Sequence, residues 1–491
     1  MGFKPHPPLG PLLIGYDPFR DLPEDHLAWF VDSVVDSCVP LGTKDGPGQP
    51  GYEVRMSTKV ILYGLSTGIR STRKLAQNCR ESLPFLLLVR DDRPSYRTLC
   101  TVRSQNRELI ETVWVSMLQM AGECGIKCVG KIAVDSTKIR ADVSRDSVVA
   151  RKDMDEVLAV FREMLREAEA MDAKEDEEGQ AVCTQTSVPV SRMREVIRRT
   201  KTKKPEKMIP TPGLSKNIEK GIQTLEAAQK ANLSQVSLTD PDARMMPIGS
   251  SKRVSMGHSF EAAADSGLLV AGQTHNGSTD NDRLGILLAE ARKTDPVPIT
   301  QVSADSGYYS GGIVNELVGQ KDLEVIVPDS ATACAMRRPC EPDPDPIEFT
   351  PVEGRNAYIC SKGKLLTATK PEFRSGQWFT TYVAQTSCLD CPSASKCLKS
   401  PNAKKRNLII GEFHDTLKQH LAQFSTPEGK ALYYARGPAI ETVFSFIRNT
   451  LNFNRWSLRG DEKVAAEATW LKAACLIRKL HTAKKALAAA A

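Results

Sequence analysis

The chain has 491 residues, of which 41% are hydrophobic and 25% charged, and its net charge is +7. That length exceeds what one hydrophobic core supports, so we expect roughly two to four domains. The composition is typical of a soluble globular protein, and the mild positive charge permits a nucleic-acid partner without requiring one. No stretch approaches the roughly 18 apolar residues of a membrane-spanning helix, which excludes an integral membrane protein.

The first ten residues, MGFKPHPPLG, lack the charged and apolar regions of a signal peptide. The 13 cysteines are an odd number in a chain without such a signal. We therefore expect reduced thiols or metal ligands and not a disulfide framework. Together these features predict a cytoplasmic protein.

Residues 1–128 read mainly as short helices joined by turns. Apolar residues recur at helical spacing in DLPEDHLAWFVDSVVDSC, STKVILYGLSTGI and RELIETVWVSMLQMAGECG. Arg70, Arg73 and Lys74 lie in one such turn and in the short helix that follows it. This arrangement fits a helix-turn-helix-like DNA-binding module, and a helical dimerisation or packing domain fits it equally well.

The pattern changes over residues 129–328. KCVGKIAVDSTKI is a strand candidate that ends at Asp135, and GHSFEAAADSGLLVAGQTHN is a hairpin that turns at Ser-Gly. A helix, a strand ending at Asp305, a second helix and the strand LEVIVPDS follow. The charged helical stretch at 145–236 contains no strand pattern and looks inserted. This succession predicts an α/β, ribonuclease-H-like core with three antiparallel strands followed by parallel ones.

Two further segments complete the chain. Residues 329–430 form a Pro- and Cys-rich insertion, and residues 431–491 turn helical again. We therefore expect a helical N-terminal domain, a mixed-sheet core with inserted segments, and a C-terminal helical part that belongs to the core.

The two strand-end aspartates carry the functional prediction. In this topology Asp135 and Asp305 lie at neighbouring strand ends. One such aspartate is usually a turn residue, but two carboxylates so close do not both stay ionised unless a cation lies between them. Mg²⁺ or Mn²⁺ prefers such oxygen ligands. Two ions roughly 3.5–4 Å apart hold the attacking and leaving oxygens of a phosphoryl displacement.

The helix YYARGPAIETVFSFIRNTLNFNRW (433–456) offers a third carboxylate, Glu441. It lies beside an apolar stripe at helical spacing, whose members are Ile440, Phe444, Ile447 and Leu451. A favourable interaction with the helix dipole is the alternative explanation for Glu441. Arg448, two turns on, shares its face and is placed to contact a phosphate or the glutamate itself.

Several motifs in order resemble the DDE transposases of bacterial insertion sequences, in the group with a helical N-terminal domain and a Cys-containing insertion. The resemblance covers nearly the whole chain. Its motifs are LPEDHLAWFVDSVVD, GIRSTRKLAQNC and RPSYRTL in the first domain, VDSTKIRAD, SLTDPDARMM and ADSGYYSGG in the core, and YYARGPAIETVFSFIRNTLNFNRWSLRGDEKVAAE in the last helices.

The resemblance implies that Asp135, Asp305 and Glu441 hold two Mg²⁺ (or Mn²⁺) ions, cut a phosphodiester at the element's end and transfer the freed 3′-hydroxyl to target DNA. It implies double-stranded DNA partners, the element's terminal inverted repeats and the target. Two active sites for two ends imply at least a homodimer. Related elements share a Tyr, Arg, Glu, Lys signature. Tyr433, Arg436 and Glu441 fit it loosely, but Arg448 replaces the lysine, and the family's EPVFG is ETVFS here.

The insertion carries the cysteines of a candidate zinc site. CLDCPSASKC supplies Cys388, Cys391 and Cys397, and Cys360 lies upstream in YICSKGK. A C-x₂-C pair with two further cysteines among turn residues indicates a structural zinc site. Reduced, partly buried thiols are the alternative.

The candidate DNA contacts are basic residues spread along the chain. The principal ones are Arg70, Arg73, Lys74, Arg436, Arg448, Arg455 and Arg459; the basic segment 192–207, with eight Lys or Arg against two Glu, is another. Such contacts fix register and salt dependence, not sequence choice. Trp456 is a candidate for stacking on an unpaired base, and a core tryptophan is the alternative.

Two other functions fit the same residues. A stand-alone metal-dependent DNA nuclease would use the three carboxylates without terminal repeats to join. A domesticated or decayed transposase would keep the fold and bind DNA without cutting it. The presence of all three acidic residues argues against decay.

Overall fold

The structure is a computed structural model. It describes residues 17–40, 52–90, 92–177, 215–248, 253–277, 283–338, 347–374, 377–398, 400 and 402–490. The predicted basic segment 192–207 lies outside these residues. Among the described residues, no helix combines the length and apolar character needed to cross a membrane.

The central sheet has the predicted mixed topology. Its strands are β1 (Lys131–Arg140), β4 (Arg244–Ile248), β5 (Arg253–Asp265), β6 (Leu268–His275), β7 (Gln301–Ala304) and β8 (Glu324–Ile326). The order is β4-β5-β1-β7-β8, with β6 also paired to β5. β5 is antiparallel to β1, β4 and β6, whereas β1, β7 and β8 are parallel to one another. The fold is therefore α/β with a ribonuclease-H-like core.

Helices link the parallel strands as crossovers. α11 (Leu284–Thr294) precedes β7, α12 (Gly311–Val318) joins β7 to β8, and α13 (Ser330–Arg337) follows β8. The predicted hairpin is confirmed as β5 and β6. Its turn residues Ser266 (φ 49°) and Gly267 (φ 78°) adopt the left-handed conformation that a tight hairpin requires.

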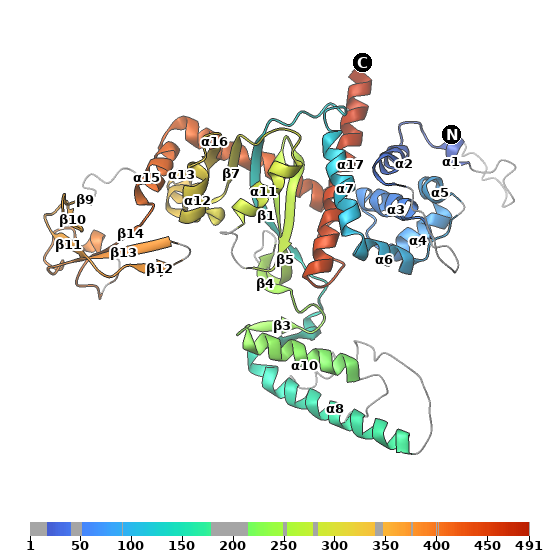
Figure 1. Cartoon of the computed structure of the whole chain (residues 1–491), viewed down its shortest axis with the longest axis horizontal. Helices are drawn as coiled ribbons and strands as arrows, with labels where there is room; N and C mark the ends of the chain where they lie inside the picture. Colours follow the sequence, from blue (N-terminus) through green and yellow to red (C-terminus); the bar gives the residue numbers. More distant parts are fainter. Residues whose placement is uncertain are drawn as a thin grey trace, which may run out of the picture.

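The helical N-terminal region is confirmed. Its helices are α1 (Pro18–Asp21), α2 (Leu27–Cys38), α3 (Val54–Ser66), α4 (Thr72–Glu81), α5 (Leu83–Val89), α6 (Tyr96–Gln105) and α7 (Arg107–Gln119). They share one hydrophobic core with the central sheet. The helical N-terminal region is therefore packed onto the central sheet and does not stand apart from it on a linker (Figure 1).

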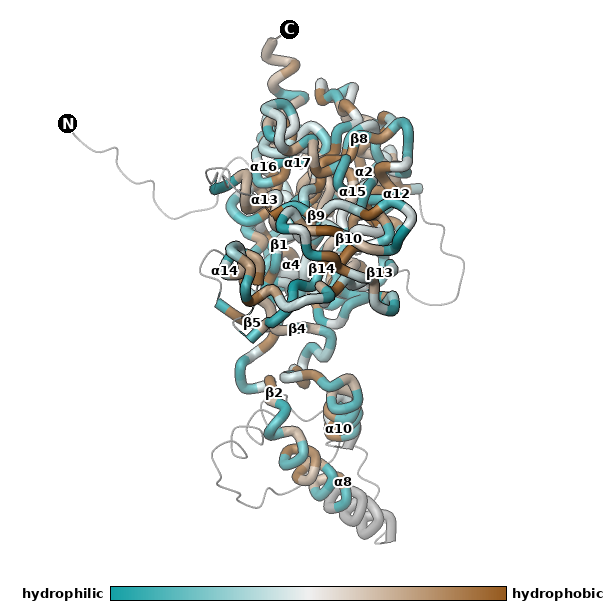
Figure 2. Tube along the Cα trace, turned by 90° about the vertical axis from the view of Figure 1, so that its left-hand side faces the viewer, coloured by the Kyte–Doolittle hydropathy of each residue, from teal (hydrophilic) through white to brown (hydrophobic). Residues whose placement is uncertain are grey.

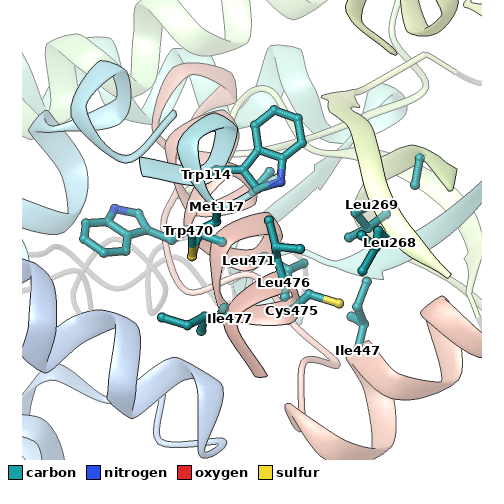
Figure 3. Close-up of a cluster of buried hydrophobic side chains, with 14 of the residues drawn as sticks. Trp114, Met117, Leu268, Leu269, Ile447, Trp470, Leu471, Cys475, Leu476 and Ile477 are labelled. Carbon is teal, nitrogen blue, oxygen red and sulfur yellow. The ribbon is translucent and has the colours of Figure 1, made fainter. Parts of the chain in front are cut away.

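The long helix α17 (Asp461–Ala490) joins these two regions. It packs on α7 and α3 and also on β6. Leu471 and Leu476 lie between Trp114 of α7 and the strand residues Leu268 and Leu269 (Figure 3). All five side chains are almost fully buried, so α17 is the central element of the core.

The segment 145–236 leaves the sheet as an arm. It comprises the short helices η1 (Arg145–Ser147) and η2 (Arg151–Asp153), β2 (Val148–Ala150), α8 (Met154–Glu177), α10 (Ser215–Lys230) and β3 (Gln235–Ser237). α8 and α10 pack on each other around a small core of their own, and the arm extends away from the sheet (Figures 1 and 2). The prediction that no strand interrupts this segment is wrong, because β2 and β3 pair at the base of the arm.

The Cys-rich segment folds into a second antiparallel sheet, which the sequence analysis did not predict. Its elements are β9 (Phe349–Pro351), β10 (Ala357–Cys360), β11 (Leu365–Ala368), β12 (Glu372–Arg374), β13 (Gln377–Ala384), α14 (Ala394–Cys397) and β14 (Asn407–Gly411). This sheet lies on the opposite side of the central sheet from the N-terminal helices (Figure 1).

The chain then returns to the central sheet through α15 (His414–Ala422), the turn η4 (Gln423–Ser425), α16 (Pro427–Ser445) and the π-helix η5 (Phe446–Thr450). α16 packs across β1, β5, β7 and β8. Its predicted apolar stripe is confirmed, since Ile440, Phe444, Ile447 and Leu451 are all buried. This packing fixes which face of α16 meets the sheet.

Candidate active site

The parallel pairing of β1 and β7 brings Asp135 and Asp305 together. Val134 pairs with Ala304 in this register, and the two aspartates are the next residue on each strand. Both side chains are partly exposed. The prediction that the first strand ends at Asp135 is wrong: β1 continues to Arg140, because residues beyond Asp135 stay paired with β5. It is the pairing with β7 that stops at this point, and the same edge of β1 is next bridged at Arg140, by Arg455.

The residues after each aspartate fix its local geometry. Asp135 Oδ1 accepts a hydrogen bond from Ser136 N at 2.7 Å. Asp305 caps the short helix η3 (Ser306–Tyr308), and its Oδ1 accepts from Gly307 N at 2.9 Å. In both cases a backbone N–H holds one carboxylate oxygen, which orients the group without neutralising it.

Arg436 of α16 brings positive charge to the two aspartates. Its Nη1 donates to Asp135 Oδ2 at 3.0 Å and to Val134 O at 3.4 Å. Burial alone would lower the pKa of Arg436, but Asp135 and Asp305 outweigh it and raise the pKa above its ordinary value. Its Nε is buried without a hydrogen-bond partner. A buried guanidinium here is thus stabilised by both carboxylates.

Glu441 lies on the same helix, just over one turn after Arg436, and its side chain is exposed. Position 437 is a glycine, and a Cβ there would lie 3.7 Å from Glu441 Oε1. Within the described residues, the three potential metal ligands whose atoms all lie within 4.8 Å of one another are Cys128, Asp265 and Asp295, not the predicted ones. The fold thus pairs Asp135 with Asp305 and places Glu441 on the helix that crosses them.

The chemistry of this donor set fits a hard divalent cation. Asp135, Asp305 and Glu441 offer only carboxylate oxygens, which Mg²⁺ and Mn²⁺ prefer. Arg436 already brings one positive charge to Asp135, at 3.0 Å.

Comparison with known families agrees with this geometry. A "Transposase DDE domain" model matches residues 359–481, and a "Transposase domain (DUF772)" model matches residues 17–105. Both matches are to transposase domains, and together they support a DDE transposase of the insertion-sequence type. No curated protein matches it. The predicted resemblance to insertion-sequence transposases is thereby confirmed.

The two matches cover different parts of the transposase fold. The first includes most of the Cys-rich sheet, from within β10 to β14, together with α16 and most of α17, and the second spans α1 to α6. Asp135 and Asp305 lie outside both matches, so their assignment rests on the topology of the sheet.

Three further arginines of this transposase follow the edge of β1 beyond its pairing with β7. Arg448, in the π-helix η5, donates to Thr137 Oγ1. Arg455 and Arg459 both form ion pairs with Asp142, each at 2.6 Å. A π-helix adds a residue to a helical turn and is frequent at functional sites. Here it shifts the register in which the helix presents Arg448 to β1.

The predicted contacts of the N-terminal region separate into two kinds. Arg70 lies against the ring of Phe453 and 3.6 Å from the buried Glu467, and burial lowers its pKa. It therefore joins the N-terminal helices to the core. Arg73 and Lys74 lie exposed on the first turn of α4, with Arg73 over the ring of Tyr96, and remain accessible to a partner.

Trp456 is a core residue. Its side chain is 1% exposed and its ring contacts Phe260 and Phe453 edge-on. The base-stacking prediction for Trp456 is therefore wrong, because an almost fully buried ring offers no face to a nucleotide, and the core alternative is correct.

The four predicted zinc ligands line one small cavity of about 20 Å³ in the second sheet. Burial raises the pKa of Cys397, and Cys388, Cys360 and Cys391 raise it further. Lys364 N donates to Cys360 Sγ at 3.3 Å. The structure thus brings these thiols together, although no three of their sulfur atoms all lie within 4.8 Å of one another.

Sequence reasoning missed the acidic residues that position the basic ones. Asp142 holds both Arg455 and Arg459, and it lies at the end of the quoted VDSTKIRAD motif. Asp240, in the quoted SLTDPDARMM motif, bonds His258 at 3.1 Å and accepts from Gly460 N at 3.0 Å. The motifs marked these positions, but the partners lie far away in the chain.

Proposed function

We propose that this transposase cuts DNA strands at the ends of an insertion sequence and transfers them to target DNA, with Asp135, Asp305 and Glu441 holding Mg²⁺ or Mn²⁺. The observation that carries the proposal is the in-register pairing of β1 with β7, which makes Asp135 and Asp305 neighbours. The match of the DDE model over α16 supports Glu441 as the third carboxylate.

Each group of the chain has a defined task in this proposal. The three carboxylates hold the metal, which when bound supplies the charge that stabilises the attacking and leaving oxygens. Arg436 orients Asp135 through its hydrogen bond. Arg448, Arg455 and Arg459 lie along β1 and contact the DNA backbone, while Arg73 and Lys74 contact it from the N-terminal helices.

The test is strand cleavage of DNA that carries the sequences flanking the gene, with and without Mg²⁺. We expect Asp305→Asn and Glu441→Gln each to abolish cleavage while DNA binding stays near that of the parent protein. Asp322→Asn and Glu428→Gln are matched controls, because they remove an exposed carboxylate of the same core and should cut normally.

Three outcomes would overturn parts of this proposal. Cleavage that survives in Asp305→Asn or Glu441→Gln removes that residue from the metal site. A parent protein that binds DNA but does not cut it with Mg²⁺ or Mn²⁺ favours a domesticated or decayed transposase. A protein that cuts but joins no ends favours the stand-alone nuclease.

The partners follow from the reaction. Two element ends need two active sites, so we propose at least a homodimer on double-stranded DNA. Size measurement by light scattering with a flanking-end duplex should give two chains per pair of ends, and a single chain holding both ends would exclude this arrangement.

We further propose that Cys360, Cys388, Cys391 and Cys397 bind a structural Zn²⁺. Four thiolates around one cavity are a donor set that zinc prefers. Elemental analysis of protein purified without chelator should find about one zinc per chain. A Cys391→Ser variant that keeps its full zinc content would exclude this site.

A further inference from the structure

A hollow of about 630 Å³ lies where the central sheet meets the base of the arm. Arg140, at the end of β1, Arg145, in η1, Arg253, at the start of β5, and Arg455, after η5, contribute side chains to its lining. We call it the arginine hollow. Asp153 is the one carboxylate among its described lining residues, so the hollow is strongly positive.

Three of these arginines lack an acidic partner. Over the described part of the chain, Arg140, Arg145 and Arg253 form no ion pair within 4.0 Å, and all three are exposed. Arg455 shares Asp142 with Arg459 and keeps 51% of its side chain exposed. Guanidinium groups that converge on one hollow and outnumber its carboxylates form a site complementary to an anion.

The hollow continues the row of arginines that begins at the proposed active site. Along β1, Arg436 contacts Asp135, Arg448 contacts Thr137, and Arg455 Nε donates to Ala141 O. These contacts follow the edge of β1 beyond its pairing with β7, since β7 pairs only as far as Val134. Arg436, Arg448 and Arg455 thus place positive charge at three points between the carboxylates and the hollow.

The spacing along β1 gives the reach of this row. Arg140 is five residues beyond Asp135, and a strand rises about 3.3–3.4 Å per residue, which makes about 17 Å. Each DNA strand carries one phosphate per 3.4 Å of helix axis. A DNA strand that runs along β1 would therefore reach the hollow about five nucleotides from a phosphodiester at Asp135.

We propose that the arginine hollow binds the phosphate backbone of the DNA about five nucleotides from the scissile phosphodiester. This inference rests on the proposed function. Arginine binds phosphate as a planar fork through two N–H groups, so the contact fixes the position of the duplex and reads no bases. Val254, which is 61% exposed at the rim, and Met245 provide apolar contact for the sugars.

The test is the salt dependence of binding to a flanking-end duplex, followed by fluorescence anisotropy. Each lost phosphate contact lowers the slope of log K against log salt by about 0.9. We expect Arg145→Gln/Arg253→Gln to lower the slope by about 2. Lys293→Gln/Lys321→Gln removes the same charge from exposed positions elsewhere on the core and should lower it far less.

Phosphate-ethylation interference locates the contact independently. The parent protein should show interference about five nucleotides from the cut, and the Arg145→Gln/Arg253→Gln protein should lose that signal alone. An unchanged slope, an equal fall in the lysine control, or interference that survives would each overturn the inference. If the parent protein cuts DNA in these cases, the proposed function stands; if it neither binds nor cuts, the proposed function itself fails.

Discussion

The tetrapeptide Ala-Asp-Ser-Gly occurs twice in the central sheet, at residues 264–267 and 304–307. The first copy ends β5 and forms the hairpin turn to β6, with two residues in the left-handed conformation. The second copy follows β7, and Asp305 (φ −78°, ψ 173°) opens a single helical turn. The same four residues therefore adopt two backbone conformations. In the first copy the chain turns back into the antiparallel strand β6, whereas in the second it leaves β7 and enters the short helix η3.

The two aspartates differ even more in their surroundings. Asp265 is fully buried, and its oxygens accept hydrogen bonds from Val129 N at 2.9 Å, Gly130 N at 2.7 Å and the Ser266 hydroxyl at 2.9 Å. The two backbone hydrogen bonds fix Val129 and Gly130, which lead into β1. Asp305 is partly exposed and shares the charge of Arg436 with Asp135. One carboxylate is held inside the fold, and the other lies partly exposed beside Asp135.

This comparison teaches that proximity alone does not identify a metal site. Cys128, Asp265 and Asp295 form the tighter group, but burial, with Asp265 adding to it, raises the pKa of Asp295 to about 6. Burial likewise raises the pKa of Cys128 to about 12. Burial thus disfavours the charged forms of Cys128 and Asp295, which are the forms that bind a metal. Access to solvent and a counter-cation distinguish the two sites better than distance does.

The largest expected effect is that of replacing Arg436, the cation beside Asp135 and Asp305. Arg436→Gln should lower the rate of strand cleavage on the order of 10³-fold, the range found for arginines that stabilise phosphoryl transfer. Arg436→Lys should keep part of the rate, because it retains the charge but loses the fork. Single-turnover cleavage measures both. Parent-like cutting by Arg436→Gln would mean that the cation at Asp135 is dispensable.

Replacing Asp265, the aspartate of the buried copy, should lower the stability of the protein and leave cleavage intact. Asp265→Asn places an amide against two backbone N–H groups and should cost about 2–3 kcal/mol of unfolding free energy. The folded protein should still cut DNA. Urea unfolding followed by tryptophan fluorescence measures the loss, with Asp305→Asn as the matched variant in the same tetrapeptide. If Asp265→Asn has the unfolding free energy of the parent protein but does not cut DNA, then Asp265 serves cleavage and not the stability of the fold.

The smallest effect is a pH dependence of stability. Asp295 has an ordinary pKa of 3.8 and a folded pKa of about 6, so the folded protein binds a proton that the unfolded chain has released. Its contribution to stability is present below pH 3.8 and is lost as pH rises through 6. Asp295→Asn should remove this part of the slope in thermal melts between these pH values. An unaltered slope would show that Asp295 is not the proton-binding group.

The sequence predicted the parts of the fold whose signals are local. The hairpin followed from alternating residues around Ser-Gly, and the apolar stripe of α16 followed from helical spacing. Both depend on residues near one another in the chain. The second sheet was missed because its strands are short, three to eight residues, and most of them show no clean alternation.

The candidate site was predictable to a similar extent. The order of the strands placed Asp135 beside Asp305, since parallel neighbours follow from topology. The partners of the basic residues were not predictable. Arg70 pairs with Glu467 and Arg455 with Asp142, and such contacts depend on how distant segments pack. For the same reason, the sequence alone does not decide whether Trp456 stacks on a base or packs in the core.

The position of α17 bears on how the protein is made. Arg103 of α6 forms a buried 2.6 Å ion pair with Glu467, and the Trp470 indole N–H donates to Arg103 O at 3.0 Å. A nascent chain that has left the ribosome as far as the Cys-rich sheet still exposes the apolar faces of α3 and α7. The first helices therefore complete their packing only after Asp461 and the residues beyond it have been synthesised. A chain that terminates before α17 would therefore leave the apolar faces of α3 and α7 exposed to water.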